Sequence, residues 1–257
     1  MRIVVKVGTS TLAYSTGHLN IRHMETLCKV LSDIKNAGYE IIMVSSGAVG
    51  MGMGKLSLTE RPKELSLKQA AAAVGQCELM YTYDKLFSEY NHTVAQLLLT
   101  AEDINDNDRK NNFTNTILKL LDLGVIPIIN ENDTVAVNEL VIGDNDTLGA
   151  IVAKSVNADL IIILSDIDGV FTADPRKNPD AELISVIDRI TPEIEKLAGD
   201  AGSSVGTGGM VTKISAAKIA TDSGCDMVIA NGADPNILYD IVEGKKAIGT
   251  RFIGVKR

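Results

Sequence analysis

The hydrophobic positions of the chain fall into short runs, each followed at once by small or polar residues. Five runs are apolar at nearly every position, which is typical of parallel strands buried on both faces of a sheet. They cover residues 3–7, 41–44, 125–129, 160–164 and 227–230, and the polar turns that follow are Gly8-Thr9-Ser10, Ser45-Ser46-Gly47, residues 130–133, residues 165–169 and Asn231-Gly232. We therefore predict five strands of one parallel sheet, each ending in a polar turn.

Stretches with helical periodicity lie between these runs. In residues 21–34 apolar side chains recur every three to four positions, and Gly38 closes the pattern. Similar stretches cover residues 64–89, 107–123, 145–157 and 209–223. This alternation predicts an α/β fold, a three-layer αβα sandwich with a mainly parallel central sheet, formed by residues 1–257 as a single domain.

In such sheets ligands bind beyond the carboxyl ends of the strands, which is where the polar turns fall. Residues 172–190 differ from the rest, because they carry two prolines and mixed charge. We expect them to leave the main sheet as an excursion such as a hairpin.

Composition excludes several classes of protein. No apolar run approaches the roughly 20 residues of a membrane-spanning helix, and the first residues resemble a strand more than a signal peptide. Cys28, Cys77 and Cys225 are far apart, which argues against a disulfide framework or a zinc site and predicts reduced thiols in the cytoplasm. The net charge is −8 with no long basic run, so a nucleic-acid surface is not expected. An anionic ligand would need positive charge concentrated locally.

Lys6 interrupts the first apolar run, just before Gly8. A lysine in a buried strand is unfavourable unless its ammonium group has a partner or reaches water. It is therefore either a side chain that extends to water at the strand end, or a cation directed at a phosphate across the glycine turn. After the second run, Ser46 and Gly47 offer backbone amides that can approach an anion, although glycine turns after strands are common.

Residues 130–150 hold two similar polar clusters, "NEND" and "GDND", on either side of a short apolar segment. Asn and Asp favour turns by bonding their own backbone, which accounts for part of this pattern. Carboxylates and amides together also suit a zwitterion, with Asp for an ammonium group and Asn for a carboxylate. A calcium site is the alternative, although the EF-hand spacing is absent.

The stretch "GTGGMVTK" (206–213) fits neither the Walker pattern nor the full G-x-G-x-x-G fingerprint. Its glycines leave backbone amides open to an anion, and a helix that begins near Gly209 would add its positive end. Lys213 lies about one turn into that helix and can reach the same anion. We therefore predict that Lys6 and Lys213 converge on one polyphosphate from the ends of different strands.

These motifs together resemble the amino-acid kinase family over nearly the whole chain. The residues that carry the resemblance are "VVKVGTS" (4–10), "VSSGAVGMG" (44–52), "IINENDTVA" (128–136), "GDNDTLGA" (143–150), "SDIDGVFTADPRKNP" (165–179) and "GTGGMVTKISAA" (206–217). The resemblance implies ATP-dependent phosphorylation of the γ-carboxylate of L-glutamate to L-glutamyl 5-phosphate, the first step of proline biosynthesis. It also implies a short form, without the C-terminal RNA-modification-type (PUA) domain that many relatives carry.

The resemblance implies a role for each site residue. Lys6 and Lys213 would act on the transferring phosphoryl group, and Asp146 would position them. Ser46, Asp133 and Asn145 would bind glutamate. The residues implied for ATP are Lys6, Ser165, Asp166, Thr207, Gly208, Gly209, Met210, Val211, Thr212 and Lys213. Mg²⁺ would arrive bound to the nucleotide, so no dedicated protein site for a metal is expected.

Other functions compete with this interpretation. One is a kinase of the same fold that acts on another carboxylate or on carbamate, and a second is a non-catalytic amino-acid sensor. A dinucleotide-dependent oxidoreductase is a third, weakened by the incomplete glycine fingerprint. As partners, the resemblance implies a homo-oligomer, feedback inhibition by proline and a glutamyl phosphate reductase that consumes the labile product, and it implies neither nucleic acid nor membrane.

Overall fold

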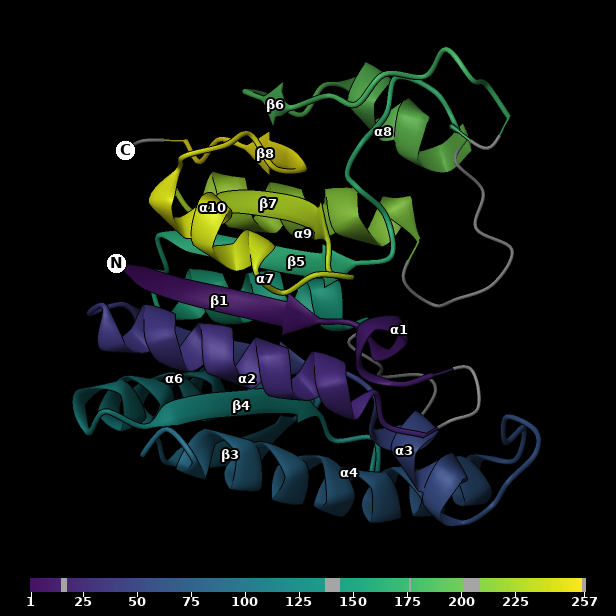
Figure 1. Ribbon diagram of the computed structural model, residues 1–257, viewed down its shortest axis with the longest axis vertical. Helices are drawn as coiled ribbons and strands as arrows, with labels where there is room; N and C mark the ends of the chain where they lie inside the picture. The colour runs from purple at the N-terminus through teal and green to yellow at the C-terminus, as the bar shows by residue number, and fades with distance from the viewer. Residues whose placement is uncertain (15–17, 137–143, 176, 201–208, 256–257) are drawn as a thin grey trace.

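The computed structural model describes residues 1–14, 18–136, 144–175, 177–200 and 209–255. Within them one sheet of eight strands runs through the molecule in the order β3-β4-β2-β1-β5-β7-β8-β6 (Figure 1). The strands are β1 Arg2–Val7, β2 Glu40–Ser45, β3 Val94–Leu99, β4 Ile126–Glu131, β5 Leu160–Ser165, β6 Val186–Ile187, β7 Asp226–Asn231 and β8 Thr250–Phe252. The first six strands in this order, from β3 through β4, β2, β1 and β5 to β7, are parallel, and β8 runs antiparallel to β7.

Helices cover both faces of the sheet. They are α1 Thr9–Leu12, α2 Ile21–Asn36, α3 Ala48–Lys55, α4 Leu65–Ser88, α5 Ala101–Asn105, α6 Asn107–Asp122, α7 Asn145–Ser155, α8 Pro192–Asp200, α9 Met210–Asp222 and α10 Ile237–Glu243. Helices α2, α4 and α10 pack on one face, and α6, α7 and α9 pack on the other (Figure 1). The predicted three-layer αβα sandwich is confirmed.

The two faces of β1 show how the strand pattern becomes two cores. Ile3, Val5 and Val7 point into the core beneath α2 and α4. Val4 points into the opposite core, with α7 and α9. Because successive side chains of a strand point to opposite faces, Lys6 shares the side of Val4 and is directed toward α7 and α9.

All five predicted strands and the five predicted helices are present, with ends within a few residues of the predicted ones. The edge strand β3 was not predicted. Most of its side chains are only partly buried and Gln96 is exposed, so "VAQLLL" lacks the fully apolar signature of the central strands.

The excursion at residues 172–190 is confirmed in part. Phe171 bridges Leu183 in antiparallel fashion, and the backbone N–H of Thr172 donates to the carbonyl of Glu182 at 2.9 Å, as in a hairpin. The prediction that this segment leaves the sheet is wrong at its end, where β6 pairs with β8 at the sheet edge. A two-residue strand is too short to produce a hydrophobic period.

Within the described part of the chain, none of the helices combines the length and the apolar character needed to cross a membrane.

Candidate active site

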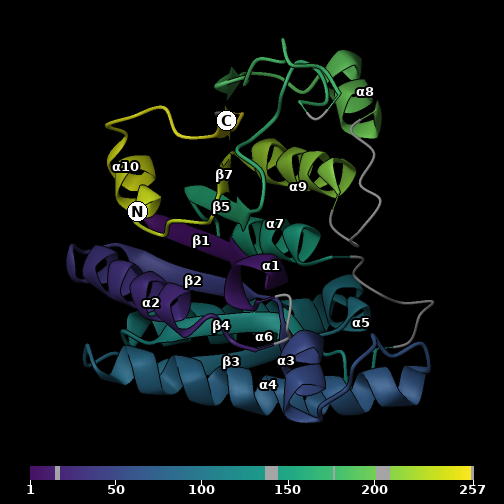
Figure 2. The ribbon, with the colours of Figure 1, turned by 45° about the vertical axis from the view of Figure 1, so that its right-hand side comes forward.

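A cavity of about 500 Å³ opens beyond the carboxyl ends of β1, β2, β4 and β5. Figures 1 and 2 show α1 and the start of α3 beside this edge of the sheet. The cavity is lined by Lys6, Gly8, Thr9, Ser10, Ser46, Gly47, Ala48, Val49, Gly50, Met53, Arg61, Lys68, Asn130, Glu131, Asp133, Asp144, Asn145, Asp146, Ser165, Asp166 and Lys213. The polar turns that follow four different strands therefore meet in one place.

Lys6 and Lys213 meet at the carboxylate of Asp146. The Nζ atom of Lys6 lies 2.7 Å from Oδ1 of Asp146, and Nζ of Lys213 lies 3.1 Å from Oδ2. All three side chains are at most one-tenth exposed. The predicted convergence of the two lysines is confirmed as geometry.

The local sequence explains how Asp146 reaches this position. Asp144 caps α7, since its carboxylate accepts hydrogen bonds from the backbone N–H and the hydroxyl of Thr147 at 2.9 and 3.2 Å. The cap starts the helix so that Asn145 and Asp146 stand in its first turn, facing the cavity. In "GDND", Asp144 thus has a structural role as the helix cap, and Asp146 is available for chemistry.

Gly149, one turn after Asp146, lets α7 lie close to β1 and β5. A Cβ atom at this position would lie 3.1 Å from Cδ1 of Ile161 and 3.6 Å from Cβ of Lys6. The stem of Lys6 therefore passes beside a helix surface that has no side chain there, and its ammonium group reaches Asp146.

The charge of Asp146 is held by its two partners. Burial alone would raise the pKa of this carboxyl, but the nearby ammonium groups of Lys6 and Lys213 outweigh burial, and the net pKa is lowered. Asp146 is thus an anion at neutral pH, and it offsets the mutual repulsion of the two cations.

A second group of side chains connects the ends of β2 and β4 with α7. Nδ2 of Asn145 donates to Oγ of Ser46 at 2.8 Å and to Oδ1 of Asn130 at 2.9 Å, with the carbonyl of Ser45 at 3.3 Å. Because an amide nitrogen has two hydrogens, Asn145 offers a ligand its oxygen, which is an acceptor. In this orientation the side-chain oxygen suits an ammonium group, whereas the sequence pattern suggested that asparagine would bind a carboxylate.

Asp133 lies on the same side of the cavity, close to two cations. Nζ of Lys68 is 3.8 Å from its Oδ1. Burial raises the pKa of Asp133, and the charges of Lys68 and Arg61 oppose this effect without cancelling it. Asp133 consequently protonates more readily than an ordinary aspartate, and burial raises the pKa of Asp144 in the same cavity as well.

The residues predicted for the nucleotide are placed in part. Ser165 and Asp166 line the cavity, and the hydroxyl of Ser165 donates to the Asp166 carboxylate at 3.1 Å. Helix α9 begins at Met210 with Gly209 as its N-cap, as predicted. The hydroxyl of Thr212 donates to the carbonyl of Gly209 at 2.7 Å.

Met210, Val211 and Thr212 stand in the first turn of α9 and are absent from the cavity lining, and Val211 is exposed. Thr207 and Gly208 lie outside the described residues.

Several residues of the cavity were not singled out from the sequence. They are Thr9, Ser10, Met53, Arg61, Lys68 and Glu131. Thr9 and Ser10 follow a predicted strand, so their position in a polar turn was the available signal. Arg61 and Lys68 carry no such signal, since they belong to a charged connection and to the first turns of α4.

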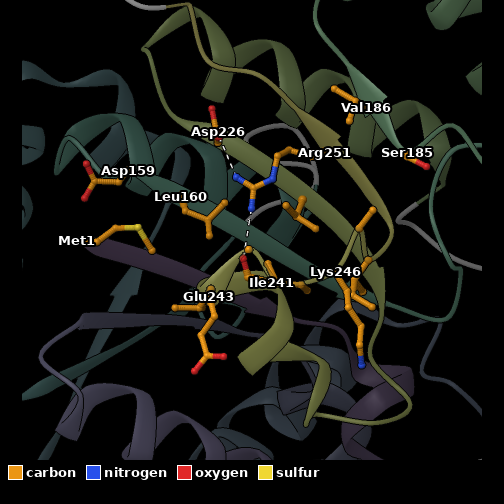
Figure 3. Close-up of a pocket in the computed structure, with 15 residues that line it drawn as sticks. Met1, Asp159, Leu160, Ser185, Val186, Asp226, Ile241, Glu243, Lys246 and Arg251 are labelled. Atoms are coloured by element: carbon orange, nitrogen blue, oxygen red, sulfur yellow. Dashed lines mark hydrogen bonds and ion pairs between the residues drawn. The ribbon is translucent and has the colours of Figure 1, made fainter.

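A second cavity, of about 480 Å³, lies at the opposite, amino ends of β1, β5 and β7. Figure 3 shows Arg251 in it, pointing at the Asp226 carboxylate and the carbonyl of Ile241, to which it donates at 2.9 and 3.3 Å. None of the residues predicted for catalysis or binding lines this cavity. Across the described ranges, no cluster of three or more His, Cys, Asp or Glu side chains is arranged to hold a metal ion.

Comparisons with known proteins agree with this architecture. The glutamate 5-kinase of Clostridium tetani (strain Massachusetts / E88) is 57% identical over 254 residues, covering 99% of this chain and 95% of that protein. The glutamate 5-kinase of Caldanaerobacter subterraneus subsp. tengcongensis is 56% identical over 256 residues, covering 100% of this chain but 68% of the longer relative.

Solved structures show the same fold at low identity. Carbamate kinase from Giardia lamblia bound to AMP-PNP superposes with a TM-score of 0.67 at 17% identity, covering 99% of this chain and 98% of the other. The isopentenyl phosphate kinase product complex of T. acidophilum gives 0.63 at 20% identity, covering 98% and 100%. The sequence pattern of the Amino acid kinase family matches residues 1–231, and the chain belongs to this family.

Proposed function

We propose that this chain transfers the γ-phosphoryl group of ATP to the γ-carboxylate of L-glutamate and releases L-glutamyl 5-phosphate and ADP. The observation that carries the proposal is the Lys6–Asp146–Lys213 cluster, held in one cavity with Ser46, Asp133 and Asn145. Family membership and relatives named glutamate 5-kinase support the same reaction. We also propose that residues 1–257 act as one catalytic domain, because a single sheet runs through the described residues.

The reaction needs no general base. A glutamate side chain has a pKa of about 4.3 in solution, so the attacking carboxylate is already ionised at neutral pH. The obstacle is electrostatic, because one anion must approach another. Lys6 and Lys213 supply fixed positive charge where negative charge spreads over the transferring phosphoryl oxygens. Asp146 holds both ammonium groups in place and is their positioning residue.

Glutamate would bind on the β2–β4 side of the cavity. In our proposal its ammonium group donates hydrogen bonds to the Asp133 carboxylate and to Oδ1 of Asn145. Ser46 contributes its hydroxyl and the adjoining glycine turn. The γ-carboxylate is thereby directed toward the lysine cluster. Positioning of this kind accounts for a large part of the rate in phosphoryl transfer.

ATP would bind on the β5 side. Ser165 and Asp166 would contact the nucleoside portion, the backbone from Thr207 to Thr212 would surround the phosphates, and the positive end of α9 would face them. When bound with the nucleotide, Mg²⁺ would neutralise phosphate charge. The cavity lining includes carboxylates, and the ion would be held largely by phosphates and water.

The decisive assay is ADP release that depends on L-glutamate, with hydroxylamine trapping of the acyl phosphate. Aspartate, N-acetylglutamate and carbamate serve as rival acceptors. Preference for one of them would show that the acceptor substrate is another carboxylate or carbamate and not glutamate. Binding of glutamate without ADP release would instead identify a sensor.

A cytoplasmic location, a homo-oligomer, feedback inhibition by proline and a glutamyl phosphate reductase as partner stay predictions of the family resemblance.

A further inference from the structure

Gln76 lies behind the cavity without lining it. It stands on α4, is 7% exposed, and its Oε1 accepts a hydrogen bond from Nδ2 of Asn130 at 2.9 Å. Asn130 is itself 2% exposed at the end of β4. A buried pair of amides is favourable only when every donor finds an acceptor, so the contact fixes how the two groups face each other.

The orientation of the Asn130 amide follows from a backbone contact. Its Oδ1 accepts from the backbone N–H of Glu131 at 2.9 Å and from Nδ2 of Asn145 at 2.9 Å. If the Asn130 amide were flipped, its NH₂ group would face the NH₂ group of Asn145, and both would be donors. The nitrogen of Asn130 must therefore point toward α4, where Gln76 supplies the acceptor.

This orientation is passed on to the cavity. Nδ2 of Asn145 is held between Oδ1 of Asn130 and Oγ of Ser46, so its own oxygen is left as the acceptor for a ligand. Three hydrogen bonds thus connect Gln76, outside the cavity, with three residues that line it, Asn130, Asn145 and Ser46.

Helix α4 is a rigid base for this chain of contacts. A Cβ atom on Gly75 would lie 1.8 Å from the carbonyl oxygen of Ala48, and one on Gly52 would lie 1.7 Å from that of Ala71, so α3 and α4 touch through their backbones. About two turns further along α4, the hydroxyl of Tyr83 forms a hydrogen bond with Oγ of Ser45 at 2.8 Å. The Gln76 amide is therefore held at a set distance from the Ser45–Ser46 turn.

We propose that Gln76 is a positioning residue for the acceptor substrate: its side-chain carbonyl holds the Asn130 amide in this orientation, and through it Asn145 and Ser46 in their positions for the substrate ammonium group. The inference rests on the proposed function for the identity of that substrate. Gln76 touches neither substrate nor reacting atoms, so its effect falls on binding of the acceptor and leaves the phosphoryl chemistry alone.

The first experiment compares Gln76→Met with wild type. Methionine keeps the length and apolar stem, and its thioether sulfur is only a weak acceptor for the Asn130 hydrogen bond. Leaving a buried donor without a partner should raise KM for glutamate roughly tenfold, with kcat and KM for ATP within about twofold. Gln76→Glu retains an acceptor oxygen and should return KM for glutamate to within about threefold of wild type. Gln96→Met, the same change at an exposed site on β3, is the matched control and should be neutral.

The second experiment is a double-mutant cycle with Asn130→Ala. If Gln76 acts through Asn130, Gln76→Met should add less than about twofold to KM once Asn130 is gone. Independent, multiplying effects would overturn the proposal. So would equal losses of kcat and of both KM values, or equal defects in Gln76→Met and Gln76→Glu.

Failure of the proposed function gives a different result. In that case wild type phosphorylates another acid in the acceptor panel, or binds glutamate without turnover. The same variants are then compared by KM for that acid or by the glutamate dissociation constant. An unchanged constant in Gln76→Met overturns the positioning role whichever ligand is used.

Discussion

Lys6 and Lys213 contact different oxygens of one carboxylate, that of Asp146, at 2.7 and 3.1 Å. Lys6 lies on strand β1, near the start of the chain, and Lys213 lies on helix α9, more than 200 residues later. Two buried ammonium groups at this spacing repel each other strongly unless an anion lies between them. Asp146 fills that place, so both cations are assembled before any phosphate arrives. Such preorganisation is what electrostatic catalysis requires.

Removal of the shared anion should damage both catalysis and folding. In Asp146→Asn the two lysines keep their charges and lose their partner. Breaking a buried ion pair from one side typically costs about 3–5 kcal/mol, and we expect a loss of this order in the free energy of unfolding. Glutamate-dependent kcat should fall roughly 10²-fold or more. Urea denaturation and steady-state assays measure the two effects, with Asp84→Asn, an exposed aspartate of α4, as the neutral control.

Each lysine should be needed for turnover. In Lys213→Ala the transferring phosphoryl group loses one cation, and kcat should drop roughly 10²-fold or more, the scale of one transition-state donor. Lys218→Ala is a matched control, since Lys218 is an exposed lysine of the same helix that pairs with Glu195. Near-normal turnover in purified, folded Lys213→Ala would exclude the proposed role, and Lys6→Ala is tested in the same way.

The lowered pKa of Asp146 predicts how its contribution to stability depends on pH. Its folded-state pKa lies below the unfolded value of about 3.9, so the stabilisation is fully present above that value and is lost as pH falls through the folded pKa. The difference in unfolding free energy between wild type and Asp146→Asn should stay constant from neutral pH to about pH 5 and shrink below pH 4. Denaturation curves across this range test the sign, and a difference that grew on acidification would contradict it.

The sequence predicted most of the fold because the central strands are apolar on both faces and end in polar turns. Lys6 could be placed at the site on the same grounds, since parallel strands deliver their turns to one edge of the sheet. Lys213 was placed there by the glycine-rich loop and the helix that begins after it. The edge strand β3 lacks this pattern, as most of its side chains are only partly buried and Gln96 is exposed.

Other features depend on contacts that residue type does not reveal. In the sequence, Gln76 is indistinguishable from a surface glutamine of a long helix, and only the buried partner on β4 distinguishes it. The direction of the Asn145 amide is a similar case. Asparagine is both donor and acceptor, and its neighbours Asn130 and Ser46 decide which end a ligand meets.

Asp133 should control the affinity for glutamate and its dependence on pH. In Asp133→Asn we expect KM for glutamate to rise roughly tenfold or more with a smaller change in kcat, because a charge-assisted contact to the substrate ammonium is lost. In wild type, burial raises the pKa of Asp133, so acidification protonates this carboxyl before an ordinary aspartate would be protonated. KM for glutamate should therefore increase as pH falls through the raised pKa, and the increase should be smaller in Asp133→Asn, where only the raised pKa of Asp144 remains in the cavity. The comparison is made above about pH 5, where the γ-carboxylate of free glutamate is still ionised. A variant impaired only toward ATP would assign Asp133 to the nucleotide instead.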